Sequence, residues 1–151
     1  MGKSLIDIAK EVIQTESDSV LLLKDRIDQN FIDVCHTLKS CMGKVVLIGM
    51  GKSGHIAKKI SSTLASTGTP AFYLHPGEAG HGDLGMVSHD DVVIMISYSG
   101  ESDEIIALLP GIKRMNVPII SMTGNANSSI ASSSDFHMDV SVDKEACPHN
   151  L

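Results

Sequence analysis

The chain begins with a helical pattern of apolar positions. Apolar side chains recur every three or four residues, with charged and amide residues between them; they are Leu5, Ile8, Val12, Val20, Leu23, Ile27, Phe31, Val34, Cys35 and Leu38. This spacing places the apolar side chains along one face of a helix. Gly43 then provides a suitable helix stop. The pattern predicts one or two amphipathic helices and a helical continuation, together covering about residues 4–40.

After Gly43 the pattern changes to short, mainly apolar runs. The run at 45–48 is wholly apolar and rich in β-branched residues, and similar runs follow at 71–74, 92–96, 118–122 and 136–140. Helical stretches lie between several of these runs, at 56–67, 103–115 and 128–133. A strand that is apolar at every position is covered by helices on both faces, and alternating strands and helices form a parallel sheet. We therefore expect one α/β domain over 1–151: a three-layer α/β/α fold of flavodoxin or Rossmann type, with a five-stranded parallel sheet core over about 44–142.

Composition and charge exclude several classes of function. Twelve Lys and Arg against eighteen Asp and Glu give a net charge of −6, the wrong sign for neutralising nucleic-acid phosphates. The apolar runs fall far short of the ~20 residues that span a bilayer. Cys35, Cys41 and Cys147 form no CxxC pair, which is typical of reduced thiols, and no targeting segment is predicted. We expect a cytoplasmic protein with neither nucleic acid nor membrane as a partner.

A glycine-rich loop, GMGKSG, follows the first predicted strand at residues 49–54. It matches the G-x-G-x-x-G fingerprint of dinucleotide binding, but the second strand ends without the acidic residue that would hold a ribose. A nucleotide-hydrolysing P-loop is excluded, because Val46 stands where its first glycine is needed. Two interpretations remain open: an anion site at a helix N-terminus, formed by Gly51, Lys52 and Ser53, or a tight turn with a solvated lysine.

The third predicted strand runs into a loop with three hydroxyl groups, those of Ser97, Ser99 and Ser102. Such hydroxyls, together with the backbone N–H groups of a starting helix, can surround a phosphate. The simpler interpretation is that Ser102 or Asp103 caps the helix, which would explain one hydroxyl but not three. Two such loops on separate strands favour a small phosphorylated ligand at one end of the sheet.

Between these loops lies a connection rich in glycine and titratable residues, at 75–85. A metal site is one interpretation, although no compact ligand spacing is present among His75, His81, Asp83 and His89. His81, flanked by glycines, is better interpreted as an acid/base group, with a surface histidine as the alternative. Glu104 and Glu145 are candidate bases, each with a solvated carboxylate as its alternative.

Several of these segments together resemble a known family. They are residues 49–54, HPGEA at 75–79, HGDLG at 81–85, SYSGES at 97–102 and EACP at 145–148. They resemble the sugar isomerase (SIS) domain of bacterial D-arabinose-5-phosphate isomerases, and the similarity runs from about Leu5 to Leu151. The Gly and Ser loops alone would indicate only a SIS domain, whereas the HGDLG and EACP segments are specific to this isomerase group.

The resemblance implies an aldose–ketose isomerase that interconverts D-ribulose 5-phosphate and D-arabinose 5-phosphate through a cis-enediolate. That reaction supplies 3-deoxy-D-manno-octulosonate for lipopolysaccharide or capsule. The implied phosphate ligands are Gly51, Ser53, Ser97, Ser99 and Ser102, and the residues implied around the sugar are Lys52, His81, Glu104 and Glu145. No cofactor is implied and no metal is required, although His81 is a candidate ligand for inhibitory zinc. The alternative function is a regulatory SIS domain that binds a sugar phosphate without transforming it.

The resemblance also implies further chain and further copies. Family members continue past the residues that end this sequence, 148–151, with another helix that carries an active-site histidine, and usually with a pair of CBS domains. We therefore expect a C-terminally incomplete SIS domain. The family implies a homodimer or homotetramer, and the helix predicted over Leu5 to Ile27 is our candidate for the contact.

Overall fold

The computed structural model describes residues 3–147. The EACP segment therefore lies within the described residues only as far as Cys147, and the expected incomplete end at 148–151 lies outside them. The strands are β1 (Val45–Gly49), β2 (Ala71–Leu74), β3 (Val92–Ile96), β4 (Ile119–Thr123) and β5 (Phe136–Asp139). The helices are α1 (Leu5–Leu22), η1 (Leu23–Arg26), α2 (Gln29–Lys39), α3 (Gly51–Ser66), α4 (Pro76–Gly80), η2 (Asp83–Met86), α5 (Asp103–Ile106), α6 (Leu109–Met115) and α7 (Ser129–Ser133).

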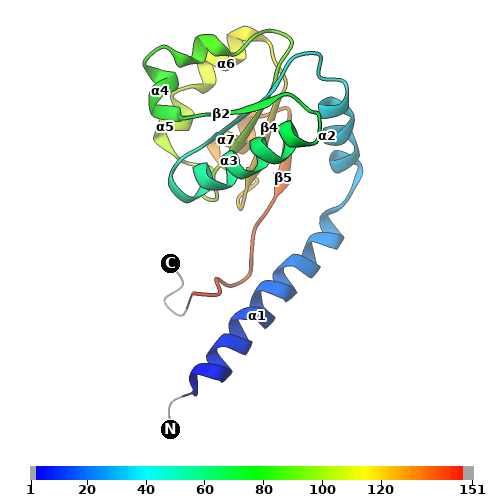
Figure 1. Cartoon of the computed structure of the whole chain (residues 1–151), viewed down its shortest axis with the longest axis vertical. Helices are drawn as coiled ribbons and strands as arrows, with labels where there is room; N and C mark the ends of the chain where they lie inside the picture. The colour runs from blue at the N-terminus through cyan, green and yellow to red at the C-terminus, as the bar shows by residue number, and fades with distance from the viewer. Residues whose placement is uncertain (1–2, 148–151) are drawn as a thin grey trace.

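The strands form the expected five-stranded parallel sheet, in the order β2-β1-β3-β4-β5 (Figure 1). The chain passes from β1 outward to β2 and then returns across β1 to β3. The connection after β1 therefore leads to one side of this strand, and the connection after β2 leads to the other side. In parallel sheets, ligands bind where the strand order reverses in this way, beside the carboxyl ends of the strands. The register places Gly49, at the end of β1, beside Ile96, at the end of β3.

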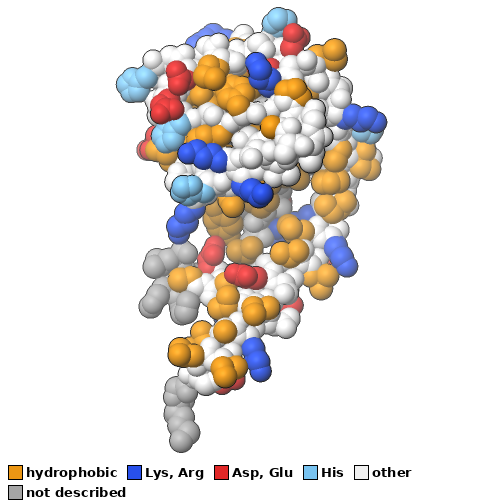
Figure 2. All heavy atoms as spheres, in the orientation of Figure 1, with side chains coloured by type: hydrophobic (Ala, Val, Ile, Leu, Met, Phe, Trp, Pro, Cys, Tyr) orange, Lys and Arg blue, Asp and Glu red, His pale blue; other side chains and the backbone are white. Residues whose placement is uncertain are grey.

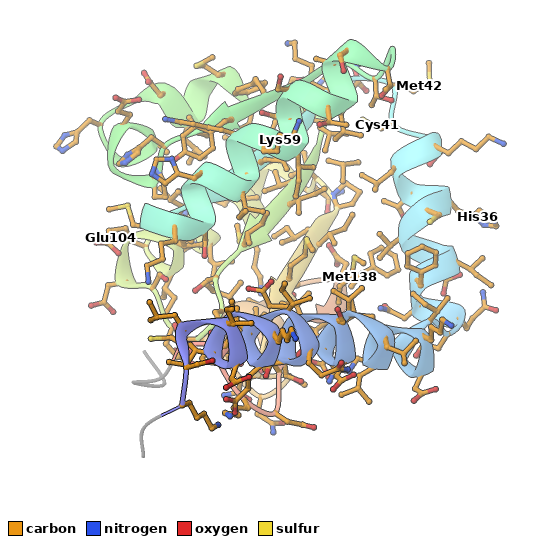
Figure 3. The ribbon with its side chains drawn as sticks, turned by 60° about the horizontal axis from the view of Figure 1, so that its bottom comes forward. His36, Cys41, Met42, Lys59, Glu104 and Met138 are labelled. Carbon is orange, nitrogen blue, oxygen red and sulfur yellow. The ribbon has the colours of Figure 1, made fainter. Side chains whose placement is uncertain are left out.

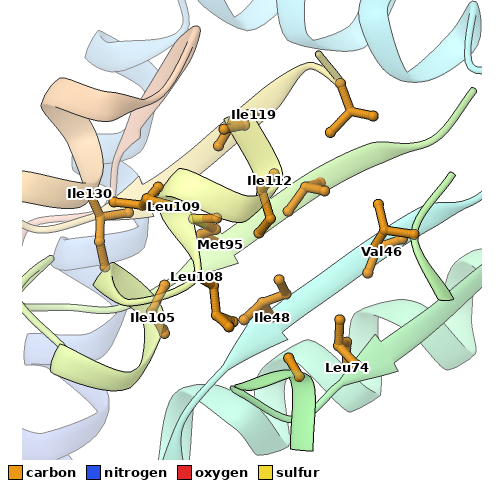
Figure 4. Packing of buried hydrophobic residues seen from close by; sticks show 14 residues of the cluster. Val46, Ile48, Leu74, Met95, Ile105, Leu108, Leu109, Ile112, Ile119 and Ile130 are labelled. Carbon is orange, nitrogen blue, oxygen red and sulfur yellow. The ribbon is translucent and has the colours of Figure 1, made fainter. Parts of the chain in front are cut away.

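Both faces of the sheet are covered, as the wholly apolar strands predict. On one face, β-strand side chains such as Leu47 and Ile120 pack against α2 and α3. On the other face, Ile48 and Met95 pack against the layer that contains α4, α5, α6 and α7 (Figure 4). All five residues of β1 and of β3 are buried. These two central strands form a rigid base for the loops that leave their carboxyl ends.

Helix α1 differs from the other described α-helices because none of its residues is buried. Ser4 and Asp7 form a capping box that satisfies backbone N–H groups at its start. Figure 1 shows α1 projecting away from the sheet, with the chain that follows β5 returning beside it. In the described part of the chain, no helix is long and apolar enough to cross a membrane.

The predicted strands agree with the structure to within one residue at each end, but three helical segments differ. Helix α3 begins at Gly51, five residues before the predicted start. The single helix expected over 103–115 is divided into α5 and α6, because Pro110 in the first turn of α6 has no N–H with which to continue α5. The connection at 75–85, expected to be a loop, contains α4 and η2.

We predict that Ile120→Ala lowers the free energy of unfolding by about 2–5 kcal/mol, because Ile120 is wholly buried in the central sheet. Urea denaturation monitored by circular dichroism measures this change. Met42→Ala is the matched control: Met42 is 88% exposed, so its truncation is expected to change the free energy by less than about 0.5 kcal/mol. Equal losses from the two variants would contradict the described core.

Candidate active site

The loop after β1 is built for close approach to the first turn of α3. A Cβ atom on Gly49 would lie 2.8 Å from the carbonyl oxygen of Ser53, so only glycine fits there. Gly51 has a φ of 54° and open space around it. Met50 occupies the N-cap position and offers no side-chain hydrogen bond to the first-turn N–H groups. These N–H groups, the exposed Lys52 and the half-buried Ser53 together favour an anion at this helix end.

Tyr73, in the neighbouring strand β2, fixes the same loop. Its hydroxyl donates a 2.8 Å hydrogen bond to the carbonyl oxygen of Gly49. A side chain on Gly54 would lie 2.9 Å from that hydroxyl, so the tyrosine occupies space that glycine leaves open. Burial, followed by the negative charge of Glu78, raises the pKa of Tyr73, and the hydroxyl remains a donor at neutral pH. Tyr73 was not identified from the sequence; the only signal was a hydroxyl in an otherwise apolar strand.

The loop after β3 gathers its serines by hydrogen bonds within the loop. Ser97 is buried, and its Oγ lies 2.8 Å from the Oγ of Ser102. Ser97 Oγ also accepts from the N–H of Gly100 at 3.2 Å, and Ser99 Oγ accepts from the N–H of Glu101 at 3.2 Å. Ser102 occupies the N-cap position of α5 but its side chain does not cap the helix. The simple capping interpretation is therefore wrong for Ser102, whose hydroxyl is drawn to Ser97 instead.

Glu101 and Gly100 fasten this loop to the start of α7. Glu101 Oε1 accepts a 2.7 Å hydrogen bond from the N–H of Ser129, and the carbonyl oxygen of Gly100 accepts from the N–H of Ile130 at 3.1 Å. Gly100 has a φ of 68°, and a Cβ there would lie 2.0 Å from Ser128 Oγ. The side chain and backbone of Ser129 lower the pKa of Glu101. Glu101 was not identified from the sequence, because its partner lies 28 residues further along the chain.

Four residues were expected around the sugar. Three of them lie at the ends of helices that pack on the sheet. Lys52 is in the first turn of α3, Glu104 is in the first turn of α5, and His81 follows the last residue of α4. All three side chains are exposed, and α4 packs against α5. Figures 1 and 3 place α5, with Glu104, on the same side of the body as the first turn of α3. Figure 2 shows histidine and acidic side chains over α4 and α5, with basic side chains beside them over α3.

Glu145 lies apart from these three, on the segment that follows β5. It is half-buried and borders a hollow with residues of α1, among them Thr15 and Ser19. The exposed Lys144 beside it forms an ion pair with Glu11 of α1, with 3.8 Å between Nζ and Oε1. Helix α1 therefore lies beside the segment that carries Glu145.

The comparison with protein families decides the classification of the chain, since the SIS domain model matches residues 38–150. This chain belongs to the SIS domain family. The curated arabinose 5-phosphate isomerase KdsD of Escherichia coli (strain K12) is 56% identical to it over 142 residues, which are 94% of this chain and 43% of the relative. The protein of that name from Pseudomonas aeruginosa is 51% identical over 146 residues, which are 97% of this chain and 45% of the relative. This SIS domain therefore spans less than half the length of the curated relatives it matches.

Solved structures agree with this classification. An E. coli CFT073 protein solved in complex with arabinose 5-phosphate has a TM-score of 0.93 and 47% sequence identity to this SIS domain, covering all of this chain and 81% of its own. The Vibrio vulnificus NanR protein complexed with ManNAc-6P is 18% identical with a TM-score of 0.76, covering 97% of this chain and 54% of its own. The second likeness shows a shared fold alone.

The alternative of a metal site among the histidines of this SIS domain does not fit the structure. His75 Nδ1 accepts a hydrogen bond from the N–H of Gly77, as the N-cap of α4. His89 pairs with Asp90 before β3 begins, at the opposite end of the sheet from the serine loop. Within residues 3–147, no group of three or more His, Cys, Asp or Glu residues is placed to hold a metal ion.

We predict that Glu101→Gln reduces the dependence of stability on pH. The pKa of Glu101 is lowered in the folded protein, so its contribution is complete above the ordinary pKa of a glutamate and is lost as pH falls through the lower, folded value. Urea denaturation from about pH 7 to about pH 3 measures this contribution. Glu16→Gln, an exposed change on α1, is the control and is expected to retain the wild-type pH profile.

Proposed function

We propose that this SIS domain is the isomerase domain of a D-arabinose-5-phosphate isomerase. The observation that carries the proposal is the pair of anion-receptive loops on β1 and β3, with ionisable side chains at their rim. The identity to relatives named arabinose 5-phosphate isomerase supports the choice of sugar phosphate. The substrates are D-ribulose 5-phosphate and D-arabinose 5-phosphate, and the product supplies 3-deoxy-D-manno-octulosonate for lipopolysaccharide or capsule.

The phosphate group is bound between the two loops. The N–H groups around Gly51 and the hydroxyl of Ser53 contact it from the start of α3, where the helix dipole favours an anion. Ser97, Ser99 and Ser102 contact it from the other loop with hydroxyls that can donate or accept. Because both loops begin on adjacent buried strands, the phosphate is held against a rigid base. Lys52 lies at the same helix end and contributes a positive charge.

The reaction moves one proton between two carbons. In open-chain arabinose 5-phosphate, a carboxylate, Glu104 or Glu145, takes the proton from carbon 2, and the electrons of that bond form the cis-enediolate. The same carboxylate returns a proton to carbon 1, while a proton passes from oxygen 2 to oxygen 1. His81 acts at the oxygens or in ring opening, and Lys52 stabilises the negative oxygen of the intermediate. Because one carbon is oxidised as its neighbour is reduced, no cofactor is needed.

A second candidate function is a sugar-phosphate-binding regulatory domain. The fold shared with a NanR protein complexed with ManNAc-6P favours it. A sensor needs the serine loops to hold phosphate, but it does not need the acid/base set of Lys52, His81, Glu104 and Glu145. Catalysis therefore distinguishes the two functions. In either function we place the protein in the cytoplasm, and Cys35 and Cys41 are free thiols.

We also propose that two or more copies associate through α1. Ile6, Ile13 and Val20 lie at intervals of seven residues, two helical turns, and their side chains are 67%, 64% and 66% exposed. Leu5 is 85% exposed at the start of the same helix. Covering this surface with a second copy removes apolar area from water, at about 25 cal/mol per Å². A homodimer or homotetramer follows.

The function is tested by incubating ribulose 5-phosphate with the chain in D₂O and recording proton NMR spectra. We expect arabinose 5-phosphate with deuterium at carbon 2, because the carboxylate exchanges its proton with solvent before returning it. The measurement is made on the 151-residue chain and on a chimera that continues into the remaining sequence of the E. coli relative. The chimera tests the expectation that a further segment completes the site.

His81→Ala in the more active of these proteins is expected to reduce turnover by about 10²-fold or more, as loss of a positioned acid/base group does. Unchanged turnover would remove His81 from the mechanism. If neither protein forms product while a sugar phosphate still binds, the isomerase proposal fails and the regulatory function is favoured. Added zinc that inhibits the wild-type enzyme but not a partly active His81 variant would identify His81 as the inhibitory ligand.

We predict that Ile13→Glu lowers the molar mass in solution from that of a dimer or tetramer to that of a monomer, because it places a charge in the apolar α1 surface. Light scattering coupled to size-exclusion chromatography measures the mass. Met42→Glu, a charge at an exposed apolar residue outside α1, is the control and is expected to retain the wild-type mass. A wild-type chain that is monomeric at every concentration would overturn this proposal.

A further inference from the structure

The segment that carries Glu145 leaves the sheet at β5 and runs to α1. Hydrogen bonds and an ion pair attach this segment to other parts of the chain. Arg26, at the end of η1, provides one attachment. Its Nη1 donates to the carbonyl oxygen of Ser141 at 2.7 Å, and its Nε lies 3.6 Å from a carboxylate oxygen of Asp139. Burial alone raises the pKa of Asp139, but Ser141, Arg26 and His137 together lower it. The carboxylate therefore remains charged and paired with Arg26 at neutral pH.

A second attachment comes from the serine loop itself. Tyr98 lies between Ser97 and Ser99, and its hydroxyl accepts a hydrogen bond from the N–H of Val142 at 3.3 Å. Val142 is three residues before Glu145 in the sequence. The side chain of Tyr98 thus spans from the proposed phosphate site to the segment of the distant carboxylate.

Tyr98 contacts Gly124 through both its backbone and its ring, although the residue is 49% exposed. Its carbonyl oxygen accepts from the N–H of Gly124 at 2.8 Å, at the end of β4. The ring lies against the same glycine, where a Cβ atom would come within 2.8 Å of it. The ring is therefore held between the end of β4 and the segment after β5. Its hydroxyl interacts with Val142.

We propose that Tyr98 is a positioning residue that couples the anion site at Ser97 and Ser99 to the segment of Glu145. An anion bound by the neighbouring serines orders the backbone of Tyr98, and its hydroxyl in turn holds Val142. The position of the Glu145 segment is then linked to the phosphate site through the side chain of Tyr98. The catalytic consequence rests on the proposed isomerase function, whereas the coupling itself does not.

The nearby ion pair of Lys144 with Glu11 does not perform this task. Both side chains are largely exposed, and exposed pairs contribute little to stability. This pair attaches the segment to α1 and not to the serine loop. Lys144 is therefore a suitable control for a change in the same segment that leaves the Tyr98 attachment intact.

The test compares Tyr98→Phe with Lys144→Met by NMR hydrogen exchange at the Val142 N–H, with and without inorganic phosphate. Phenylalanine retains the ring against Gly124 and removes only the acceptor oxygen. We expect Val142 to exchange about two- to tenfold faster in Tyr98→Phe, as loss of one hydrogen bond predicts. Phosphate is expected to slow this exchange in the wild type and in Lys144→Met, but not in Tyr98→Phe.

Equal exchange rates in wild type and Tyr98→Phe, or an equal response to phosphate, would overturn the proposal. In the isomerase assay, Tyr98→Phe is expected to lower kcat by about two- to tenfold with KM nearly unchanged, because the phosphate ligands remain while Glu145 is displaced. Wild-type kcat in this variant would remove the catalytic consequence. If no protein turns over while Val142 exchange responds to phosphate as expected, the coupling stands and the isomerase proposal fails.

Discussion

The site depends on one constraint, the parallel register of β1 and β3. Pairing places Gly49 beside Ile96, so the two loops leave the sheet next to each other and both begin a helix there. Parallel strands need long crossovers, and the residues that meet here are separated by more than forty positions in the chain. Because both strands are buried along their whole length, neither loop can shift without disturbing the core. The position of the proposed anion site follows from strand pairing before any side chain is considered.

Each loop is then held in shape by a residue outside its own motif. Tyr73 binds the carbonyl oxygen of Gly49 from the neighbouring strand, and Ser129 donates its N–H to Glu101 from the helix after β4. Gly54 and Gly100 supply the space for these contacts, since a side chain at either would collide with its neighbours. A loop that presents N–H and hydroxyl groups to a ligand cannot use all of these groups in hydrogen bonds within itself. Hydrogen bonds from adjacent strands and helices therefore stabilise the two loops.

The periphery of the molecule has a different organisation. Helix α1 has no buried residue, and the segment after β5 is attached to it by the Glu11–Lys144 pair and to the neighbouring η1 by Arg26. Glu145 therefore borders a helix with no buried residue, whereas Lys52, His81 and Glu104 lie at the ends of helices that pack on the sheet. Under the proposed function, proton transfer needs the two parts at a fixed separation. The proposed association of α1 with another copy and the proposed Tyr98 attachment would both act on that separation.

Much of the fold and part of the site could be predicted from the sequence. Apolar runs such as 45–48 and 92–96 determined the strands and the parallel α/β class, because burial on both faces leaves only apolar residues in a strand. Glycine and serine patterns at 49–54 and 97–102 determined the two anion-receptive loops, because their chemistry is local. The division of α5 from α6 was missed although Pro110 signals it, since helical periodicity continues across the break.

Only the tertiary structure decided which distant residues support the loops and where Glu145 lies. The roles of Tyr73, Glu101 and Tyr98 depend on partners 24, 28 and 44 residues away, which no local pattern identifies. Helix capping was the simpler interpretation of the Ser102 hydroxyl, but in the fold this hydroxyl lies 2.8 Å from that of the buried Ser97. The apolar face of α1 predicted a helix without revealing that the sheet leaves it uncovered. The periodicity of the sequence indicates that a helix has an apolar face. Only the tertiary structure determines which surface, if any, covers that face.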